Sequence, residues 1–310
     1  MKMCRGGGSY ADEKKCKERK VFRIGWMEHR LRWVPKMKRG IALGLAMLVA
    51  LGVAFGSEKM HPYTRTTTIR DVMDDPVFQG NGRLLFPVDE GYMSGSTLGT
   101  LRLTWYDAID PDETVKIANY LHDEAASGRQ VFHDIYSEEE KRQDPAKRDT
   151  GLFFFKGKEG GRTAIVNAGG GFAYVGAMQD SFPHALALSE QGYNAFALIY
   201  RPGAGTACQD LSRAIAFLFE HQEAMGISMD GYSLWGGSAG ARMAAWVGTY
   251  GTAAFGERQL PKPAAVIMEY TGLDEVTGIE PPTYAVVGTG HHDAEGQTQP
   301  GSHLRGRGNR

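Results

Sequence analysis

The second half of the chain alternates short apolar runs with amphipathic stretches. Continuous apolar runs predict buried strands, and apolar residues three or four positions apart predict helices. We expect strands over Leu152–Phe155, Thr163–Asn167, Tyr193–Tyr200, Tyr232–Trp235, Ala264–Tyr270 and Thr283–Val287. We expect helices over Met178–Glu190, Asp210–Met225 and Ala239–Tyr250. Buried strands that alternate with helices indicate an α/β fold, with a mostly parallel sheet covered by helices on both faces.

Residues 58–150 have a less regular pattern and are expected to form an accessory N-terminal region before a core over 151–290. The pattern predicts a helix over Asp112–Ser127. Strands are expected over Leu84–Val88, Leu98–Tyr106 and Val131–Tyr136. The charge-rich stretch Glu138–Asp149 is expected to be a solvated connection.

The N-terminus carries the pattern of an export signal. Ile41–Phe55 is an uncharged apolar run that follows a cluster of basic residues. It is short for a bilayer-spanning helix and typical of a signal-peptide core. We expect residues 37–57 to act as a signal peptide, with an uncleaved signal anchor as the alternative, and the body to be secreted or held in the cell envelope. Residues 1–36 are expected to be a basic extension upstream of the true start.

Charge and cysteine content exclude several classes of function. Residues 1–39 carry a net charge of +9, which leaves −10 on the remaining chain. An acidic body argues against nucleic-acid binding, which needs a basic face. Membrane contact is expected only through the N-terminal segment, if it is uncleaved. Cys4 and Cys16 lie in the leader, so Cys208 is alone in the body and no disulfide is expected within it. Nothing in the Cys and His spacing indicates a metal site.

The stretch SLWGGSAGARMAAW (233–246) holds the strongest candidate for chemistry. An apolar strand, a G-x-S-x-G pentapeptide and a helix follow one another, which is the context of a nucleophile elbow. Ser238 would then be a nucleophile on a strained turn. The alternative is a Gly-Ser turn whose serine only caps the following helix.

A glycine run after the strand at 163–167 supplies a second signal. Backbone N–H groups of Gly170 and Gly171, together with that of Ala239, are expected to form an oxyanion hole. A flexible turn and a dinucleotide-binding loop are the alternatives. The spacing is not G-x-G-x-x-G, and the next strand ends in Tyr200-Arg201 rather than in an acidic residue. Both observations argue against a dinucleotide-binding loop.

Several segments in order resemble bacterial α/β hydrolases of the esterase/lipase type, related to acetyl esterases. They are TGLFFFKG, AIVNAGGGFAYVGAMQDSFPHALALSEQGYNAFALIYRPG, DLSRAIAFL, YSLWGGSAGARMAAW and PPTYAVVGT. The resemblance implies a Ser-His-Asp hydrolase of small-molecule esters, with short acyl or acetyl groups and no cofactor. Ser238 matches the nucleophile, and Gly170 and Gly171 match the oxyanion donors. Ala168 replaces a frequent histidine, and Asp210 matches a structural acid.

The acid and base of the triad are the weakest part of the pattern. In the resembled family both follow the last predicted strand, but here a Gly-, Arg- and His-rich tail begins after Thr289. Asp293 and His292 are the formal candidates, and solvated tail residues are the alternative. We expect that the reading frame was lost near Thr289, which leaves the fold incomplete at its C-terminus, residues 291–310 disordered and catalysis impaired. A non-catalytic α/β-hydrolase-like binding protein is therefore the alternative function.

The sequence offers further candidates for the acid and the base of the triad. His291 and His303 are further formal bases, and Asp274 is an alternative acid. The remaining histidines of the body are expected to be structural or exposed; they are His122, His133, His184 and His221.

Overall fold

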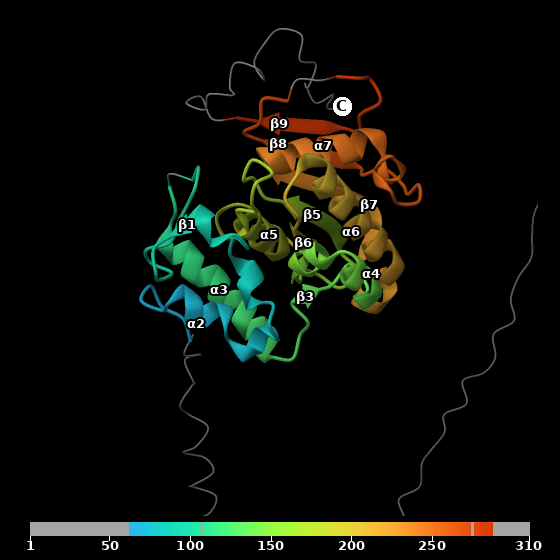
Figure 1. Ribbon diagram of the computed structural model, residues 1–310. Coiled ribbons are helices and arrows are strands. Elements are labelled where there is room, and N and C mark those ends of the chain that lie inside the picture. Colours follow the sequence, from blue (N-terminus) through green and yellow to red (C-terminus); the bar gives the residue numbers. More distant parts are fainter. Residues whose placement is uncertain (1–61, 107, 274–275, 288–310) are drawn as a thin grey trace, which may run out of the picture. The chain divides into compact units, whose positions relative to one another are not determined.

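The described residues form a seven-stranded sheet with the strand order β3-β4-β6-β5-β7-β8-β9 (Figure 1). The computed structural model describes residues 62–106, 108–273 and 276–287, which all lie in one unit, Lys59–Arg310. The strands are β3 (Phe132–His133), β4 (Gly151–Phe155), β5 (Arg162–Asn167), β6 (Asn194–Ile199), β7 (Ser228–Gly237), β8 (Ala265–Glu269) and β9 (Thr283–Val286). The five strands β6, β5, β7, β8 and β9 are parallel to one another. The pairs β3–β4 and β4–β6 are antiparallel. The predicted α/β class and mostly parallel sheet are confirmed.

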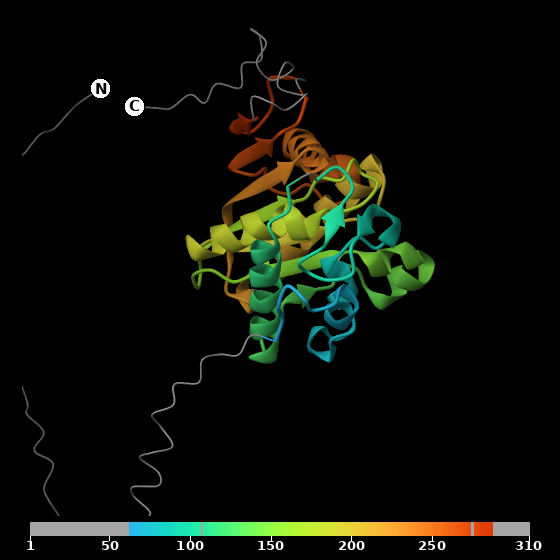
Figure 2. The ribbon, with the colours of Figure 1, turned by 90° about the vertical axis from the view of Figure 1, so that its left-hand side faces the viewer.

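Three helices cover this sheet: α5 (Ser181–Glu190), α6 (Ala204–Met225) and α7 (Ala239–Tyr250). Alternate residues of β4 point to opposite faces. Phe153 and Phe155 pack on Phe182 of α5, while Phe154 stacks on Phe196 on the face where α6 lies. The two faces therefore have different helical cover, as Figure 2 shows from the side. No helix among the described residues is long and apolar enough to cross a bilayer.

The region before the core is built from short elements. Its helices are α2 (Ile69–Met73), α3 (Pro111–Ala126) and α4 (Glu138–Gln143). Its strands β1 (Met93–Ser94) and β2 (Arg102–Leu103) form a separate two-stranded sheet. Short 3₁₀ turns span Pro76–Phe78, Gly82–Leu85, Glu90–Tyr92 and Pro145–Asp149. Tyr120 of α3 stacks on Phe155 at 5.4 Å between ring centroids, so this region shares one apolar core with the sheet.

Several predicted elements are wrong or misplaced. Leu84–Val88 is no strand, since Gly82–Leu85 forms a 3₁₀ turn whose leucines are buried by tertiary packing. The stretch expected as a connection, Glu138–Asp149, begins with the helix α4. Only Arg102–Leu103 of the predicted strand Leu98–Tyr106 is extended in a sheet.

The helix limits also shift in places. α6 begins at Ala204, six residues before its predicted start at Asp210. A 3₁₀ turn at Ala177–Gln179 precedes α5, which begins at Ser181. In contrast, α7 has the predicted limits, Ala239–Tyr250. The predicted leader (1–36), the signal segment (37–57) and the tail (291–310) lie outside the described residues.

The sheet register brings three loops to one edge. Asn167 at the end of β5 pairs with Gly236 of β7, and Gly237 pairs with Glu269 at the end of β8. The carboxyl ends of these parallel strands are therefore level with one another. In open α/β sheets, ligands bind at this edge.

Candidate active site

Ser238 makes the turn between a strand and a helix by itself. β7 ends at Gly237 and α7 begins at Ala239. The Ser238 backbone has φ 49° and ψ −115°, a region that costs a non-glycine residue about 1–3 kcal/mol. The structure thus places Ser238 in the strained strand–turn–helix context that the sequence predicts for a nucleophile.

The glycines around Ser238 are required by close backbone contacts. A Cβ atom on Gly236 would collide with the backbone of Gly240, and a Cβ on Gly240 would collide with the carbonyl group of Asn167. A Cβ on Gly237 would lie 2.8 Å from a carboxylate oxygen of Asp180. Strand, turn and helix can pack this closely only because these positions have no side chain.

The glycine run after β5 passes beside Ser238. A Cβ placed on Gly169 would lie 3.1 Å from the Ser238 Cβ. Gly170 and Gly171 have φ values of +128° and +61°, which favour glycine. Within the described part of the chain, the N–H groups of Gly170, Gly171 and Ala239 donate to no protein acceptor. These are the three groups that the sequence predicts as oxyanion donors.

The accessory region packs directly on this glycine loop. Trp105 lies against Gly171, since a Cβ placed on Gly171 would be 3.0 Å from its indole ring. The Trp105 backbone also has a positive φ of 70°, and the residue is 66% exposed. The hydroxyl of Tyr174 donates to the carbonyl of Thr104. Residues 104 and 105 are therefore part of the wall around the loop.

One buried carboxylate, that of Asp180, collects three hydrogen bonds at this edge. Its Oδ2 accepts from the Gly169 N–H at 2.6 Å, from the Tyr106 hydroxyl at 2.9 Å and from the Tyr270 hydroxyl. Asp180 is 2% exposed. Burial, followed by the nearby Asp180 charge, raises the pKa of both Tyr106 and Tyr270 above the usual value. Both hydroxyls therefore stay protonated and act as donors.

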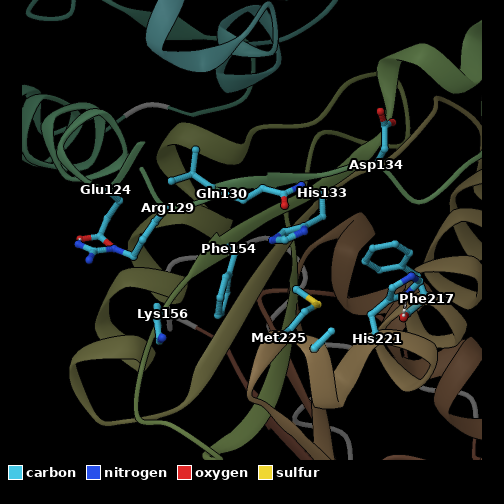
Figure 3. A pocket seen from close by; sticks show the side chains of 12 residues that line it. Glu124, Arg129, Gln130, His133, Asp134, Phe154, Lys156, Phe217, His221 and Met225 are labelled. Atoms are coloured by element: carbon cyan, nitrogen blue, oxygen red, sulfur yellow. Dashed lines mark hydrogen bonds and ion pairs between the residues drawn. The ribbon is translucent and has the colours of Figure 1, made fainter. Parts of the chain in front are cut away.

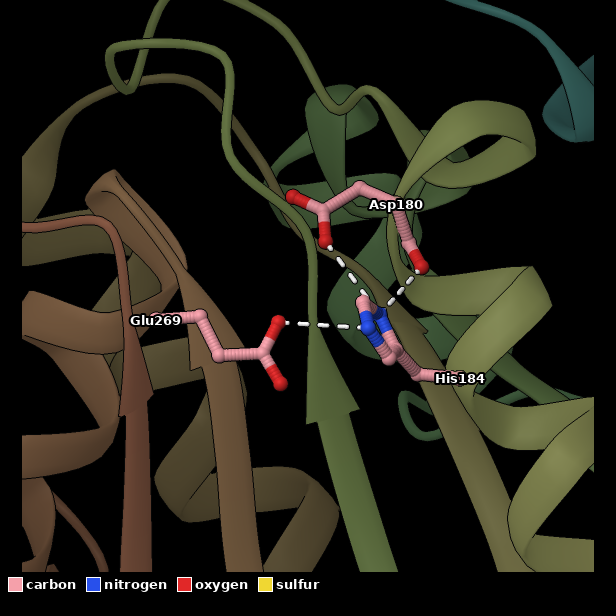
Figure 4. Close-up of side chains that lie close together, drawn as sticks. All are labelled: Asp180, His184 and Glu269. Carbon is pink, nitrogen blue, oxygen red and sulfur yellow. Dashed lines mark hydrogen bonds and ion pairs between the residues drawn. The ribbon is translucent and has the colours of Figure 1, made fainter. Parts of the chain in front are cut away.

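His184 lies between two carboxylates (Figure 4). Its Nε2 is 3.2 Å from Glu269 Oε2, and its Nδ1 is 3.6 Å from Asp180 Oδ1 and 2.8 Å from the Asp180 carbonyl oxygen. A hydrogen bond to Asp180 and the charges of both acids raise the pKa of His184 to about 9. Burial raises the pKa of Glu269, and the His184 charge only partly offsets this effect. At neutral pH His184 is a cation.

This cluster holds residue types that also bind metals, but its geometry fits an ion-paired histidine. The side chains of Asp180, His184 and Glu269 place ligand atoms within 4.8 Å of one another. Both imidazole nitrogens of His184 face oxygen atoms on different sides of the ring. A protonated imidazole donates through both nitrogens, which is the arrangement expected between two oxygen acceptors.

The predicted acid and base lie where the structure gives no description. Asp293 and His292, like His291, His303 and Asp274, are outside the described residues. Within the described residues, the Ser238 hydroxyl forms no hydrogen bond. His184 lies at the same edge of the sheet, but its ring nitrogens face Asp180 and Glu269.

The other body histidines and Asp210 lie in other surroundings. His122 packs edge-on against Tyr63 with ring centroids 5.2 Å apart, and His221 stacks on Phe217 at 4.2 Å. Burial lowers the pKa of His133 to about 4, so its ring is neutral. Asp210 is fully buried, where it accepts from Tyr136, Arg201 and the Arg201 backbone N–H. The contacts of Asp210 are those of a structural acid, the role that the resemblance implies.

A cavity of about 500 Å³ lies at the other end of the sheet (Figure 3). Its wall includes Phe154 of β4 with Phe217 and Met225 of α6. Phe154 pairs with Phe196, which lies in the N-terminal half of β6 and not at its carboxyl end. Met225 is the last residue of α6. Ser238 does not contribute to this cavity, which is therefore separate from the candidate active site.

Sequence reasoning missed Asp180 and the pairing of His184. The local signal is visible, because Asp180 and His184 are four residues apart at the start of the helix that follows the glycine run. The partners Tyr106, Glu269 and Tyr270 are remote in the sequence, so spacing gives no indication of them. Only the register of β7 and β8 brings Glu269 to this edge.

Comparison with protein families gives a match over residues 153–279, to the family model BD-FAE. This confirms the resemblance to α/β hydrolases of the esterase type. The segment contains the glycine run, Asp180, His184, Ser238 and Glu269. A search of curated proteins gives no match.

Solved structures with a similar fold include hydrolases of low sequence identity. MGS-M1, an α/β hydrolase from a Medee basin deep-sea metagenome library, is 21% identical (TM-score 0.37; 46% of this chain and 67% of that chain covered). The thermophilic esterase Est2 of the planctomycete Thermogutta terrifontis is 20% identical (TM-score 0.39; 48% and 56% covered). A bacterial heroin esterase is 22% identical (TM-score 0.36; 40% and 40% covered). The chain thus spans about half the length of the latter two proteins.

Proposed function

We propose that this chain, which has the fold of α/β hydrolases, is a serine hydrolase that takes an acyl group from a small-molecule carboxylic ester onto Ser238. The observation that carries the proposal is the Ser238 turn, with φ 49° on a non-glycine residue between β7 and α7. Strain of this kind persists only where the surrounding structure imposes it, and it gathers at sites of chemistry.

The chemistry follows from the groups around the turn. The Ser238 hydroxyl attacks the ester carbonyl, and the tetrahedral intermediate carries a negative charge on its oxygen. The unpartnered N–H groups of Gly171 and Ala239, with that of Gly170, supply donors for this charge. Loss of the alcohol leaves an acyl-Ser238 ester, which water then cleaves.

The attack also needs a base that removes the hydroxyl proton. His184 is not in position to serve in this arrangement, because its two ring nitrogens face oxygen atoms of Asp180 and Glu269 and it forms no hydrogen bond with the Ser238 hydroxyl. We propose His292 as the base and Asp293 as the acid that orients it. We also propose that turnover is impaired in this chain. Short acyl and acetyl esters are the proposed substrates, on the basis of the resemblance to acetyl esterases.

The second candidate is a non-catalytic protein that binds a ligand at the same edge. The observation in its favour is that no histidine forms a hydrogen bond with Ser238 within the described residues. A serine without a base is a poor nucleophile, so the two candidates differ in the reactivity of Ser238.

Labelling with a fluorophosphonate tests the proposal directly. We expect one label per chain, on Ser238, and complete loss of the label in Ser238→Ala. Ser233→Ala is the matched control: Ser233 lies on the same strand, its hydroxyl contacts the Trp235 indole N–H, and its loss should leave labelling intact. Absence of label from the unaltered chain would reject the serine hydrolase and favour the binding protein.

We also propose that the N-terminal segment 37–57 exports the protein to the cell envelope or medium. The support is the basic cluster followed by the apolar run Ile41–Phe55. N-terminal sequencing of the protein recovered from outside the cytoplasm should give a start shortly after Gly56. A start at Met1 in a purely cytoplasmic protein would contradict this proposal.

A further inference from the structure

The side chain of Asp180 makes unusual contacts for a residue that directly precedes a helix. It is the N-cap of α5, where an aspartate side chain normally accepts a backbone N–H of its own helix. The Asp180 side chain makes no such bond. Its Oδ2 instead accepts from Gly169, Tyr106 and Tyr270, which come from three different segments. The carboxylate therefore connects segments of the chain rather than capping one helix.

Each of the three donors belongs to a different part of the active-site edge. Gly169 begins the oxyanion loop, and Tyr270 follows directly after β8. Tyr106 comes from the accessory region, next to the exposed Trp105 that lies against Gly171. The same carboxylate also packs against Gly237, the residue before the nucleophile.

We propose that Asp180 is a positioning residue that holds the oxyanion loop at a fixed distance from Ser238, and that Tyr106 couples the accessory region to this function. The proposal rests on the proposed function, since it assigns a role in forming the oxyanion hole. It does not make Asp180 a catalytic residue, because Asp180 acts through the Gly169 backbone.

The glycine loop is flexible by itself. Three consecutive glycines have little conformational preference of their own, so contacts from outside must fix their N–H directions. A hydrogen bond to a buried carboxylate is about twice as strong as a neutral one. Because Gly169 also lies against the Ser238 Cβ, a fixed Gly169 fixes the separation of loop and nucleophile.

The charge of Asp180 needs compensation, because an unpaired carboxylate beside an oxyanion would oppose the reaction. His184 supplies it: the imidazole Nδ1 is 3.6 Å from Asp180 Oδ1, on the side away from the three donors at Oδ2. One carboxylate oxygen thus faces a cation, and the other organises the loop.

The test combines one structural measurement and one chemical measurement on the full chain. Hydrogen exchange of the Gly169 amide, followed by NMR, reports on the loop without any need for catalysis. The rate of fluorophosphonate labelling reports on the reactivity of Ser238. Asp180→Asn is the main variant, and Tyr106→Phe and Tyr270→Phe remove single donors with little change of shape.

Asp210→Asn is the matched control. Asp210 is also fully buried and also accepts from a tyrosine hydroxyl and a backbone N–H, but its partners are Tyr136 and Arg201 rather than the oxyanion loop. A general loss of stability from removal of a buried carboxylate should therefore appear in Asp210→Asn as well.

We expect Gly169 exchange to accelerate at least about tenfold in Asp180→Asn, with labelling slowed by about 10- to 100-fold, since small misplacements of reacting groups have effects of this size. Tyr106→Phe should shift both quantities in the same direction by less, and Asp210→Asn should leave both within about twofold. Unchanged exchange at Gly169 in Asp180→Asn, or equal effects in Asp210→Asn, would overturn the proposal.

Two further outcomes are also decisive. If Asp180→Asn does not fold, the two tyrosine variants decide: unchanged Gly169 exchange in both overturns the positioning role. If the unaltered chain takes no label, the serine hydrolase is rejected. Gly169 exchange in Asp180→Asn then still supports or rejects the anchoring of the loop by Asp180.

Discussion

The backbone N–H of Ser238 donates to the carbonyl oxygen of Glu269 at 2.9 Å. The side chain of Glu269 lies 3.2 Å from His184 Nε2. One residue at the end of β8 therefore holds the strained turn through its backbone and forms a partly exposed ion pair through its carboxylate. The elbow does not depend on β7 and α7 alone, since β8 and α5 support it as well.

Replacement of Ser238 by glycine should stabilise the protein. Glycine adopts φ 49° without the penalty that serine has there, and part of the gain is offset by the greater freedom of glycine in the unfolded chain. We expect the free energy of unfolding to rise by about 1 kcal/mol, measured by urea denaturation. Ser238→Ala should leave it nearly unchanged, because alanine has the same backbone restriction. Lower stability in Ser238→Gly would show that the turn is not strained.

Substitution by alanine at two glycines near helix starts should change the free energy of unfolding in opposite directions. Gly240 is the second residue of α7, where a Cβ would collide with the Asn167 carbonyl. Gly205 is the second residue of α6, with nothing within 4 Å of the Cβ position. Gly240→Ala should lower the free energy of unfolding by about 3 kcal/mol. Gly205→Ala should raise it by about 0.5–1 kcal/mol. Similar values for the two variants would contradict the close packing of α7 on β5.

The ion pair of His184 should make stability depend on pH above neutrality. The folded-state pKa of His184 is raised to about 9 from an ordinary value of 6.5. The stabilisation is therefore fully present below pH 6.5 and is lost as the pH rises through about 9. Since the His184 side chain is 41% exposed, solvent screens the effect, and only its sign and pH range are predicted.

Urea denaturation at pH 6 and at pH 9.5 measures this dependence. We expect the unaltered protein to lose more stability between these values than His184→Gln does. Glu269→Gln keeps the histidine but removes one carboxylate. Its loss of stability between these pH values should lie between those of the unaltered protein and His184→Gln. An equal loss in the unaltered protein and in His184→Gln would show that His184 is not held as a cation.

The sequence predicts the core of the sheet well because its signals are local. The helix Ala239–Tyr250 is confirmed at both ends, since the Ser238 turn and Gly251 mark its limits. α4 was missed although its signal is local too: Ser137 and Glu140 form a capping box, but the surrounding charges suggest a solvated stretch. The charges of this short helix conceal its periodicity.

The site could be predicted only in part. The nucleophile turn and the glycine run follow from adjacent residues, whereas the Asp180 network depends on contacts between residues that are far apart in the sequence. Tyr106 is 74 positions from Asp180, and Tyr270 is 90 positions away. No periodicity extends over such separations, so only the fold shows that these side chains meet.

Acceptance of an acyl group by Ser238 is the basis of the proposed function. Its most direct test is the intact mass of the protein after brief reaction with p-nitrophenyl acetate and acid quenching, followed by peptide mapping. We expect a mass gain of one acetyl group, located on Ser238 and absent from Ser238→Ala. No acetylation, or acetylation that persists in Ser238→Ala, would contradict it.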